Sequence, residues 1–363
     1  FIQSLAKDTD NGIESVNKIL EEYNAGIDFE ELFRRFTVAL AIDSDNPGDG
    51  IYSFDTIDIK LNYDSAATFN KPGVPAWGAD YISMEDTGKI KSILFDGINF
   101  MPVPWIVADD PTGNGDQVLW GNQGDEVDNM IIFEADLTNV NAATLKFDHL
   151  YDIEEAWDYG LVQVSTDNGN SWTSLANADT RSDLDPDGYP AISEKLPGFT
   201  GTIGEWTTEE FDLSSYAGNK ILVAFRYMTD WGTNGAGWYI KNIEVPEIGL
   251  VKDASNLDEF MSIDEVLGIT VDYAVAFINE KTAGKSGNSH IKVLNIDPFN
   301  ISEEDAITLR GYMNNGDNHM IVWYAAPAGK KGSVDYSYEL QYRGNNIKDT
   351  NGNGHGGKGG KHN

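Results

Sequence analysis

Short runs in which apolar and polar residues alternate make up most of the chain between residues 89 and 345. The clearest run is 220–228, where every second residue is apolar, as in a half-buried strand. Further strand candidates are 130–135, 144–149, 160–165, 237–245, 271–277, 290–296, 320–325 and 334–342. Because no long helical pattern separates them, these runs predict antiparallel β-sandwiches.

The first forty residues have a helical pattern instead. Apolar residues recur there every three or four positions in two segments, each preceded by a capping-box pattern: Asn11 with Glu14, and Asp28 with Glu31. Gly26 lies between the segments, where a helix would end. We therefore expect a helical hairpin that packs on a larger body.

The expected fold class is mainly β, an antiparallel jelly-roll or β-sandwich with a short N-terminal helical segment and a second, smaller C-terminal β-sandwich. The expected domains are a helical hairpin with an extended connection (1–88), the jelly roll (89–247), the smaller sandwich (248–345) and a Gly-rich tail (346–363). This tail is too polar to bury a core.

Charge narrows the range of partners. The chain has 59 Asp and Glu against 25 Lys and Arg, a net charge of −34, which excludes sequence-independent binding to nucleic acid and favours cations. It has no cysteine, so disulfides and thiolate metal sites are excluded. No apolar run approaches the ~18 residues that a membrane span needs.

Motifs of the common catalytic classes are absent from the sequence. There is no H-E-x-x-H zinc-protease motif, G-x-S-x-G elbow, Walker loop or Rossmann fingerprint. His149, His290 and His319 have no partner at ligand spacing. Whether the parent protein is an enzyme stays open. Because the chain begins at Phe1 rather than Met, we expect a processed product or a fragment whose catalytic residues, if any, lie upstream.

One stretch, DLDPDGYPAISE at 183–194, matches the twelve-residue calcium-loop pattern D-x-[DN]-x-[DN]-G-x5-E. Its candidate ligands are Asp183, Asp185, Asp187 and Glu194. The helices that normally flank such a loop are not predicted here, so an ion would bind within a loop of another fold.

Two further acidic clusters lie beside predicted strands. DIEEAWDYG (152–160) supplies Glu154 and Asp158, and LWGNQGDEVDN (119–129) supplies Asp125, Glu126 and Asp128. Crowded carboxylates repel one another unless a cation or solvent separates them. We expect at least one calcium ion in the jelly roll; the alternative for each single residue is a solvated turn.

The tryptophans allow two interpretations. Trp157, Trp172, Trp206 and Trp238 fall in or near strands and should pack in the core. Trp105 and Trp231 lie in segments rich in Asp, Gly or Pro, so they could stack on a sugar ring, although packing is the commoner role.

Three stretches together carry a family resemblance: LWGNQGDEVDNMIIFEADLT, LKFDHLYDIEEAWDYGLVQVSTDNGNSWTSL and GEWTTEEFDLSSYAGNKILVAFRYMTDWGTNGAGWYIKNIEV. They resemble the jelly-roll module that follows the catalytic domain in secreted metallopeptidases of the immune inhibitor A type. FEELFRRFTVALAID is similar to the end of that catalytic domain. The resemblance implies a secreted, calcium-stabilised accessory module, with zinc only in a catalytic domain upstream of this chain.

One departure from that family concerns metal binding. The family's common ending G-x-x-I-D-D-I is Trp238 to Ile243 here, with Lys241 and Asn242 in place of the two acids. If those acids bind metal in relatives, the resemblance implies that this site is altered or lost in the present chain.

The function expected from these observations is a non-catalytic, calcium-stabilised C-terminal portion of a secreted metallopeptidase, extracellular or at the cell surface, serving stabilisation or attachment to substrate. Two alternatives stay open: an extracellular structural protein that assembles into fibres or layers, and a carbohydrate-binding module. The expected partners are calcium ions and a protein substrate, a surface glycan or further copies of the chain. Asn300 lies in the chain's N-x-[ST] sequon.

Overall fold

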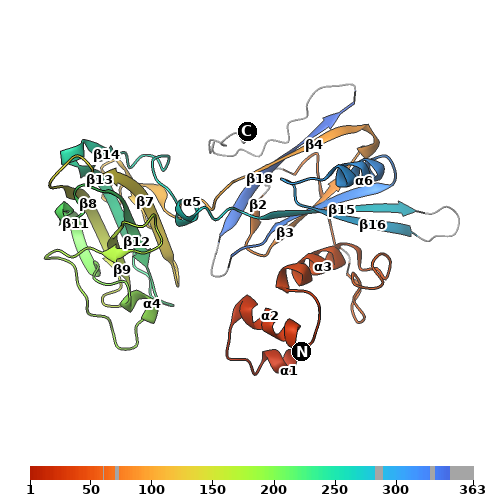
Figure 1. Ribbon diagram of the computed structural model, residues 1–363, viewed down its shortest axis with the longest axis horizontal. Helices are drawn as coiled ribbons and strands as arrows, with labels where there is room; N and C mark the ends of the chain where they lie inside the picture. Colours follow the sequence, from red (N-terminus) through yellow and green to blue (C-terminus); the bar gives the residue numbers. More distant parts are fainter. Residues whose placement is uncertain (60, 70–72, 283–288, 328–331, 344–363) are drawn as a thin grey trace. The chain divides into compact units, whose positions relative to one another are not determined.

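The computed structural model describes residues 1–59, 61–69, 73–282, 289–327 and 332–343 (Figure 1). The predicted tail at 346–363 lies outside the described residues. Two compact units form the chain: a central unit, residues 100–270, and a split unit built from residues 1–99 and from the chain after residue 270. Among the described residues, no helix is long and apolar enough to cross a membrane.

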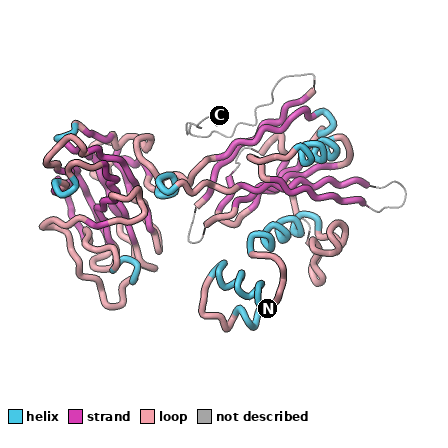
Figure 2. The backbone as a smooth tube through the Cα atoms, in the orientation of Figure 1, coloured by secondary structure: helices cyan, strands magenta, loops and turns pink. Residues whose placement is uncertain are grey.

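The central unit is a sandwich of two mainly antiparallel sheets, drawn in magenta in Figure 2. One sheet has the order β10-β9-β12-β7 and the other β11-β8-β13-β6-β5, with β14 paired to β13. The strands are β5 (Ile106–Asp109), β6 (Gln117–Trp120), β7 (Asp128–Asp136), β8 (Thr144–Ile153), β9 (Tyr159–Ser165), β10 (Thr173–Ser174), β11 (Gly201–Asp212), β12 (Lys220–Met228), β13 (Gly237–Val245) and β14 (Leu250–Lys252). Short helices are α4 (Pro190–Ser193), α5 (Ile263–Leu267) and the 3-10 turns Ser214–Tyr216 and Pro246–Ile248.

Aromatic side chains from both sheets fill the space between them. Phe147 on β8 meets Phe225 on β12 edge-to-face, with 4.8 Å between ring centroids, and Trp238 on β13 contacts the same Phe225 ring at 5.7 Å. All three side chains are almost fully buried. Fully burying one such side chain contributes about 1.5–3 kcal/mol, so these contacts hold the two sheets face to face.

The split unit contains a five-stranded sheet, β1-β3-β17-β15-β16, and a three-stranded sheet, β2-β18-β4. Its strands are β1 (Asp64–Ser65), β2 (Gly73–Pro75), β3 (Ala79–Met84), β4 (Ile90–Gly97), β15 (Tyr273–Thr282), β16 (Ser289–Ile296), β17 (Asp317–Tyr324) and β18 (Ser333–Tyr342). Its helices are α1 (Ile2–Leu5), α2 (Gly12–Glu22), α3 (Phe29–Ile42), α6 (Glu303–Met313) and the 3-10 turn Thr87–Lys89.

Helix α3 covers one face of the five-stranded sheet. Its Val38 and Ala39 pack with Ile278 and Trp323 of that sheet. The predicted cap forms, because the Asp28 side chain accepts a hydrogen bond of 2.9 Å from the Glu31 N–H. Asn11 precedes α2 as expected but makes no side-chain cap hydrogen bond.

The predicted fold class, mainly antiparallel β with sandwich packing and few helices, is confirmed. The division of the chain differs from the expected sequential one, however. Strand β3 pairs with β17, and β4 pairs with β18, so segments more than two hundred residues apart share sheets. Residues before 100 therefore belong with the C-terminal strands, a pairing that alternation alone does not reveal.

Two local features also differ from expectation. Helix α6 was not predicted, although Ser302 and Asp305 form its capping box. Trp105 is fully buried rather than placed in an open loop, because its Nε1–H donates to the Asn129 carbonyl at 3.0 Å in the core.

Candidate metal centre

Three loops of the central unit come together at one end of the β9-β12-β7 row. In the strand register, Tyr159 at the start of β9 pairs with Met228 at the end of β12, and Met228 also pairs with Asp128 at the start of β7. The loops that continue from these three positions are therefore neighbours. Asp158 directly precedes β9, and Asp230 follows β12 by two residues.

These loops bring three carboxylates together. Ligand oxygens of Glu154, Asp158 and Asp230 lie within 4.8 Å of one another. Asp158 is fully buried and Asp230 is 3% exposed. Oδ1 of Asp158 accepts a hydrogen bond of 2.9 Å from the Asp230 N–H, whereas its Oδ2 accepts none from any described residue. A buried carboxylate oxygen without a donor is costly, so this oxygen is a candidate ligand for a cation.

The raised pKa values of two of these acids also favour a cation between them. The pKa of Asp158 is raised to about 7, first by burial and then by the neighbouring charges of Asp230 and Glu154. Burial also raises the pKa of Glu154, with a further contribution from Asp230. Three crowded carboxylates cannot all ionise at low cost without a cation between them.

The backbone around the carboxylates is cross-linked by hydrogen bonds. The Thr229 hydroxyl donates to the Gly124 carbonyl at 2.7 Å and accepts from the Val127 N–H at 2.9 Å. The Glu126 N–H donates to the Asp230 carbonyl at 2.5 Å. The 121–127 loop is thus fixed against the β12–β13 loop, which carries Asp230.

Oxygen is the only ligand element offered here. Carboxylate oxygens suit a hard cation such as Ca²⁺, whereas structural zinc is usually held by cysteine and histidine. The three residues could therefore hold a hard cation such as Ca²⁺ between the β8–β9 and β12–β13 loops. Glu154, less buried than its two neighbours, would be the residue nearest to solvent.

The remaining acids of the two predicted clusters are engaged by other groups. Asp128 accepts two hydrogen bonds of 2.6 Å from the Arg226 guanidinium. Asp125 accepts one of 2.7 Å from the Asn234 amide. Asp125 still lies close enough to add to the raised pKa of Asp158. Glu126 contributes its backbone N–H to the Asp230 carbonyl, as described above.

The structure spreads the acids of the 183–194 loop apart. Asp183 pairs with the Arg181 guanidinium at 2.5 Å, and the Asp185 side chain accepts from the Asp187 N–H at 3.0 Å. Glu194 caps helix α4 on the exposed surface. Within the described residues these four acids form no group with three ligand atoms in reach of one ion.

Apolar contacts, in contrast, hold the same loop in place. Ile192 is fully buried among Tyr159, Leu161 and Met228, and Leu184 and Tyr189 pack against that group. The loop is therefore anchored to β9 and β12 through its apolar residues, while Asp187 points to the exposed side.

Asp230 is the ligand candidate that sequence reasoning missed. Both flanking strands were predicted, but the pairing of β9 with β12 was not. Had that pairing been inferred, Asp230 would have stood close to Asp158 as an acid just beyond a strand end. The signal was therefore present in the sequence as TDW (229–231), directly after the clearest strand pattern.

Comparison with known proteins adds a match to a protein family. Residues 109–280 match the model described as immune inhibitor A-like, MAM domain. The resemblance to immune inhibitor A-type metallopeptidases is confirmed. The immune inhibitor A-like MAM match covers nearly all of the central unit and therefore all three carboxylates of the candidate centre.

Among curated proteins, the chain is similar to two that are peptidases by name and to immune inhibitor A. The chain is 28% identical over 149 residues to the pre-pro-metalloprotease PrtV of Vibrio cholerae serotype O1, covering 40% of this chain and 15% of PrtV. It is 28% identical over 140 residues to immune inhibitor A of Bacillus thuringiensis subsp. alesti, covering 38% and 18%. Bacillopeptidase F of Bacillus subtilis matches over 99 residues, also at 28%, covering 27% and 5%. The aligned part is thus less than a fifth of each relative.

Proposed function

We propose that this chain is a non-catalytic portion of a secreted immune inhibitor A-like metallopeptidase and that calcium stabilises its central unit. The family match supports the first part, together with a sequence that contains no H-E-x-x-H motif. In this proposal, zinc and the catalytic groups belong to another part of the parent protein. The chain's role is then to stabilise the enzyme or to attach it to a protein substrate or surface outside the cell.

The observation that carries the calcium proposal is Asp158 Oδ2, a fully buried carboxylate oxygen without a hydrogen-bond donor among the described residues. Glu154 and Asp230 stand beside it and bring two more negative charges. A divalent cation would offset this repulsion and supply the missing partner. Because such an ion binds the folded chain and not the unfolded one, it would raise stability by mass action.

Thermal unfolding in millimolar calcium and in excess chelator tests this proposal. We expect a higher midpoint with calcium for the wild-type chain and no calcium response for Asp158→Asn, which keeps the side-chain size but removes the charge. Asp187→Asn is the matched control, since it removes an exposed acid of the 183–194 loop, and it should keep the full response. A full response in Asp158→Asn would refute the assignment of the ion to this centre.

A second candidate function, carbohydrate binding, is favoured by one residue. Trp231 directly follows Asp230, is 54% exposed, and meets the Tyr189 ring edge-to-face at 6.0 Å. An exposed indole beside a metal centre suits stacking on a sugar. Quenching of the Trp231 fluorescence by iodide, with Trp231→Phe as the reference, tests this. Protection by a glycan would support sugar binding, and equal quenching with every sugar of a glycan panel would reject it.

A further inference from the structure

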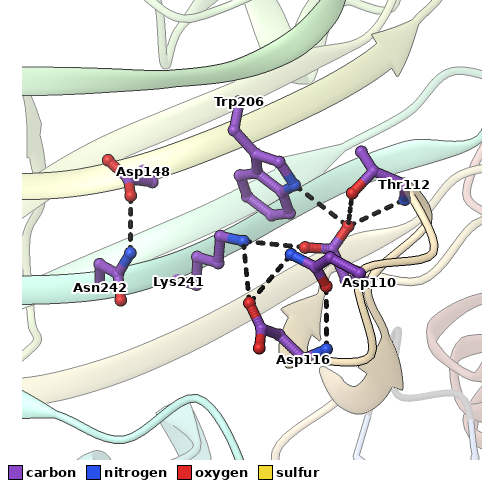
Figure 3. Close-up of polar contacts among 8 residues, drawn as sticks. Asp110, Thr112, Asp116, Asp148, Trp206, Lys241 and Asn242 are labelled. Carbon is purple, nitrogen blue, oxygen red and sulfur yellow. Dashed lines mark hydrogen bonds and ion pairs between the residues drawn. The ribbon is translucent and has the colours of Figure 1, made fainter.

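A second acidic cluster in the central unit already contains a cation from the chain itself. Asp110 lies at the end of β5, in the hairpin loop that joins β5 to β6, and its side chain is fully buried. Figure 3 shows the Lys241 ammonium group, from β13, directed at this carboxylate. Nζ lies 2.8 Å from Asp110 Oδ2 and 3.8 Å from Asp116 Oδ2.

The hairpin loop has the spacing of a calcium loop. Asp110, Thr112, Asn114 and Asp116 occupy alternate positions, as ligands 1, 3, 5 and 7 do in the twelve-residue calcium loop. Gly115 stands at the sixth position, where such loops carry glycine, and has φ +87°. The loop lacks the bidentate Glu of the twelfth position, because that position is Gly121, directly after β6.

The chain supplies four hydrogen-bond donors to the buried carboxylate. Oδ1 of Asp110 accepts from the Thr112 N–H at 2.8 Å, from the Thr112 hydroxyl at 2.6 Å and from the Trp206 Nε1–H at 3.1 Å. Oδ2 accepts from Lys241. Burial alone would raise the pKa of Asp110, but the bonds from Lys241, Thr112 and Trp206 outweigh it and hold the pKa below its ordinary value.

The Lys241 side chain is also held in place, by Trp206 and by its low exposure. Its ammonium group lies 4.1 Å from the centre of the Trp206 ring, and its side chain is 13% exposed. A cation over an indole face is attracted by the ring quadrupole as well as by the carboxylates. The Lys241 ammonium group therefore lies where a bound cation would lie, between two carboxylates and 2.8 Å from a buried oxygen.

We propose that Lys241 is a built-in cation that fills the 110–116 loop, so that the central unit holds a divalent ion at Glu154, Asp158 and Asp230 but excludes one from this loop. Residue 241 then decides how many divalent ions the unit binds. The statement about the Glu154 centre rests on the proposed function, whereas the statement about the 110–116 loop stands independently of it.

A gain-of-site variant tests the proposal. In the Asp158→Asn background, which lacks the first centre, Lys241→Asp should create calcium binding. We expect a midpoint that rises by several degrees with millimolar calcium, and about one equivalent of terbium whose luminescence is sensitised by Trp206. Asp158→Asn with Lys241 intact should show neither effect. A folded Lys241→Asp variant without the gain would overturn the proposal.

Lys241→Met keeps the experiment decisive if Lys241→Asp does not fold, because it retains most of the stem and removes only the charge. Its midpoint should fall in chelator and recover in part with calcium in the same Asp158→Asn background. No recovery would contradict a cation role for Lys241. Adding Asp110→Asn should abolish the calcium recovery, and its persistence would place the ion elsewhere.

Hydrogen exchange of the wild-type chain gives an independent readout. On chelation, amides of 154–158 and 229–232 should lose protection while those of 110–116 stay unchanged. Loss of protection at 110–116 would show that a divalent ion binds there despite Lys241. If no segment responds to chelation, the first centre fails as a calcium site, while the Lys241 variants still test the second loop.

Discussion

The sandwich contains two buried acid clusters, Asp158 with its neighbours and Asp110 with its loop. They differ in whether a basic side chain of the described residues lies beside the buried carboxylate. Asp110 faces Lys241 and three further donor groups, and its pKa is lowered. Asp158 faces Glu154 and Asp230, has one oxygen without a donor among the described residues, and its pKa is raised to about 7. An acidic cluster is therefore a candidate metal centre only when the chain supplies no cation of its own.

The largest expected effect comes from removing that internal cation. Lys241→Met leaves Asp110 buried without its partner, and breaking a buried ion pair in this way costs about 3–5 kcal/mol. Urea unfolding in chelator measures the loss. The double variant Lys241→Met with Asp110→Asn should recover most of it, because both charges are then gone. If Lys241→Met alone lowered the free energy of unfolding by less than about 1 kcal/mol, Lys241 would not be the cation that balances Asp110.

The pH dependence of stability should reveal the other cluster. The pKa of Asp158 rises from 3.8 to about 7 on folding, so the folded chain retains a proton that the unfolded chain releases. Without calcium, stability should therefore fall as pH rises from about 4 to about 7, by about 2 kcal/mol after allowance for solvent screening. The measurement is urea unfolding in chelator between pH 5 and pH 8, expressed as wild type minus Asp158→Asn. A flat difference would contradict the raised pKa.

Calcium affinity should depend on the protonation of the same residue, Asp158. Because a carboxylate ligand must lose its proton before it binds, affinity should weaken by about tenfold for each pH unit below 7 and level off above it. Calorimetric titrations at pH 5.5, 6.5 and 7.5, repeated in buffers of different ionisation enthalpy, measure both the affinity and the released proton. An affinity that does not change with pH would exclude Asp158 as a ligand.

The smallest effect is expected in the loop that most resembles a calcium loop by sequence. Asp187 is exposed and outside the carboxylate group, so Asp187→Ala should change stability by no more than about 0.5 kcal/mol. Ile192→Ala, in contrast, should cost about 2–5 kcal/mol because this side chain is fully buried. Urea unfolding of both variants compares the polar and apolar anchors. A loss of stability clearly above about 0.5 kcal/mol in Asp187→Ala would favour calcium binding in the 183–194 loop.

Much of the fold could be predicted because alternation marks half-buried strands. The run 220–228 coincides with β12. Pairing between distant strands could not be predicted in this way. Contacts such as β4 with β18 depend on which surfaces fit together in three dimensions, and that information is not local.

The candidate site was predicted only in part for the same reason. Glu154 and Asp158 were recognised because they stand together in one acidic run, whereas Asp230 joins them only through the pairing of β9 with β12. In the 183–194 loop, the sequence pattern predicted a site that the packing of the loop does not favour. Its residue types match a ligand pattern, but the backbone path is set by Leu184, Tyr189 and Ile192, which pack beneath the exposed acids.

Calorimetric titration of the chelator-treated wild-type chain with calcium is the decisive test of the proposed calcium site. We predict one bound ion per chain at pH 7.5, lost in Asp158→Asn and retained in Asp187→Asn. No binding by the wild-type chain, or binding that survives Asp158→Asn unchanged, would contradict it.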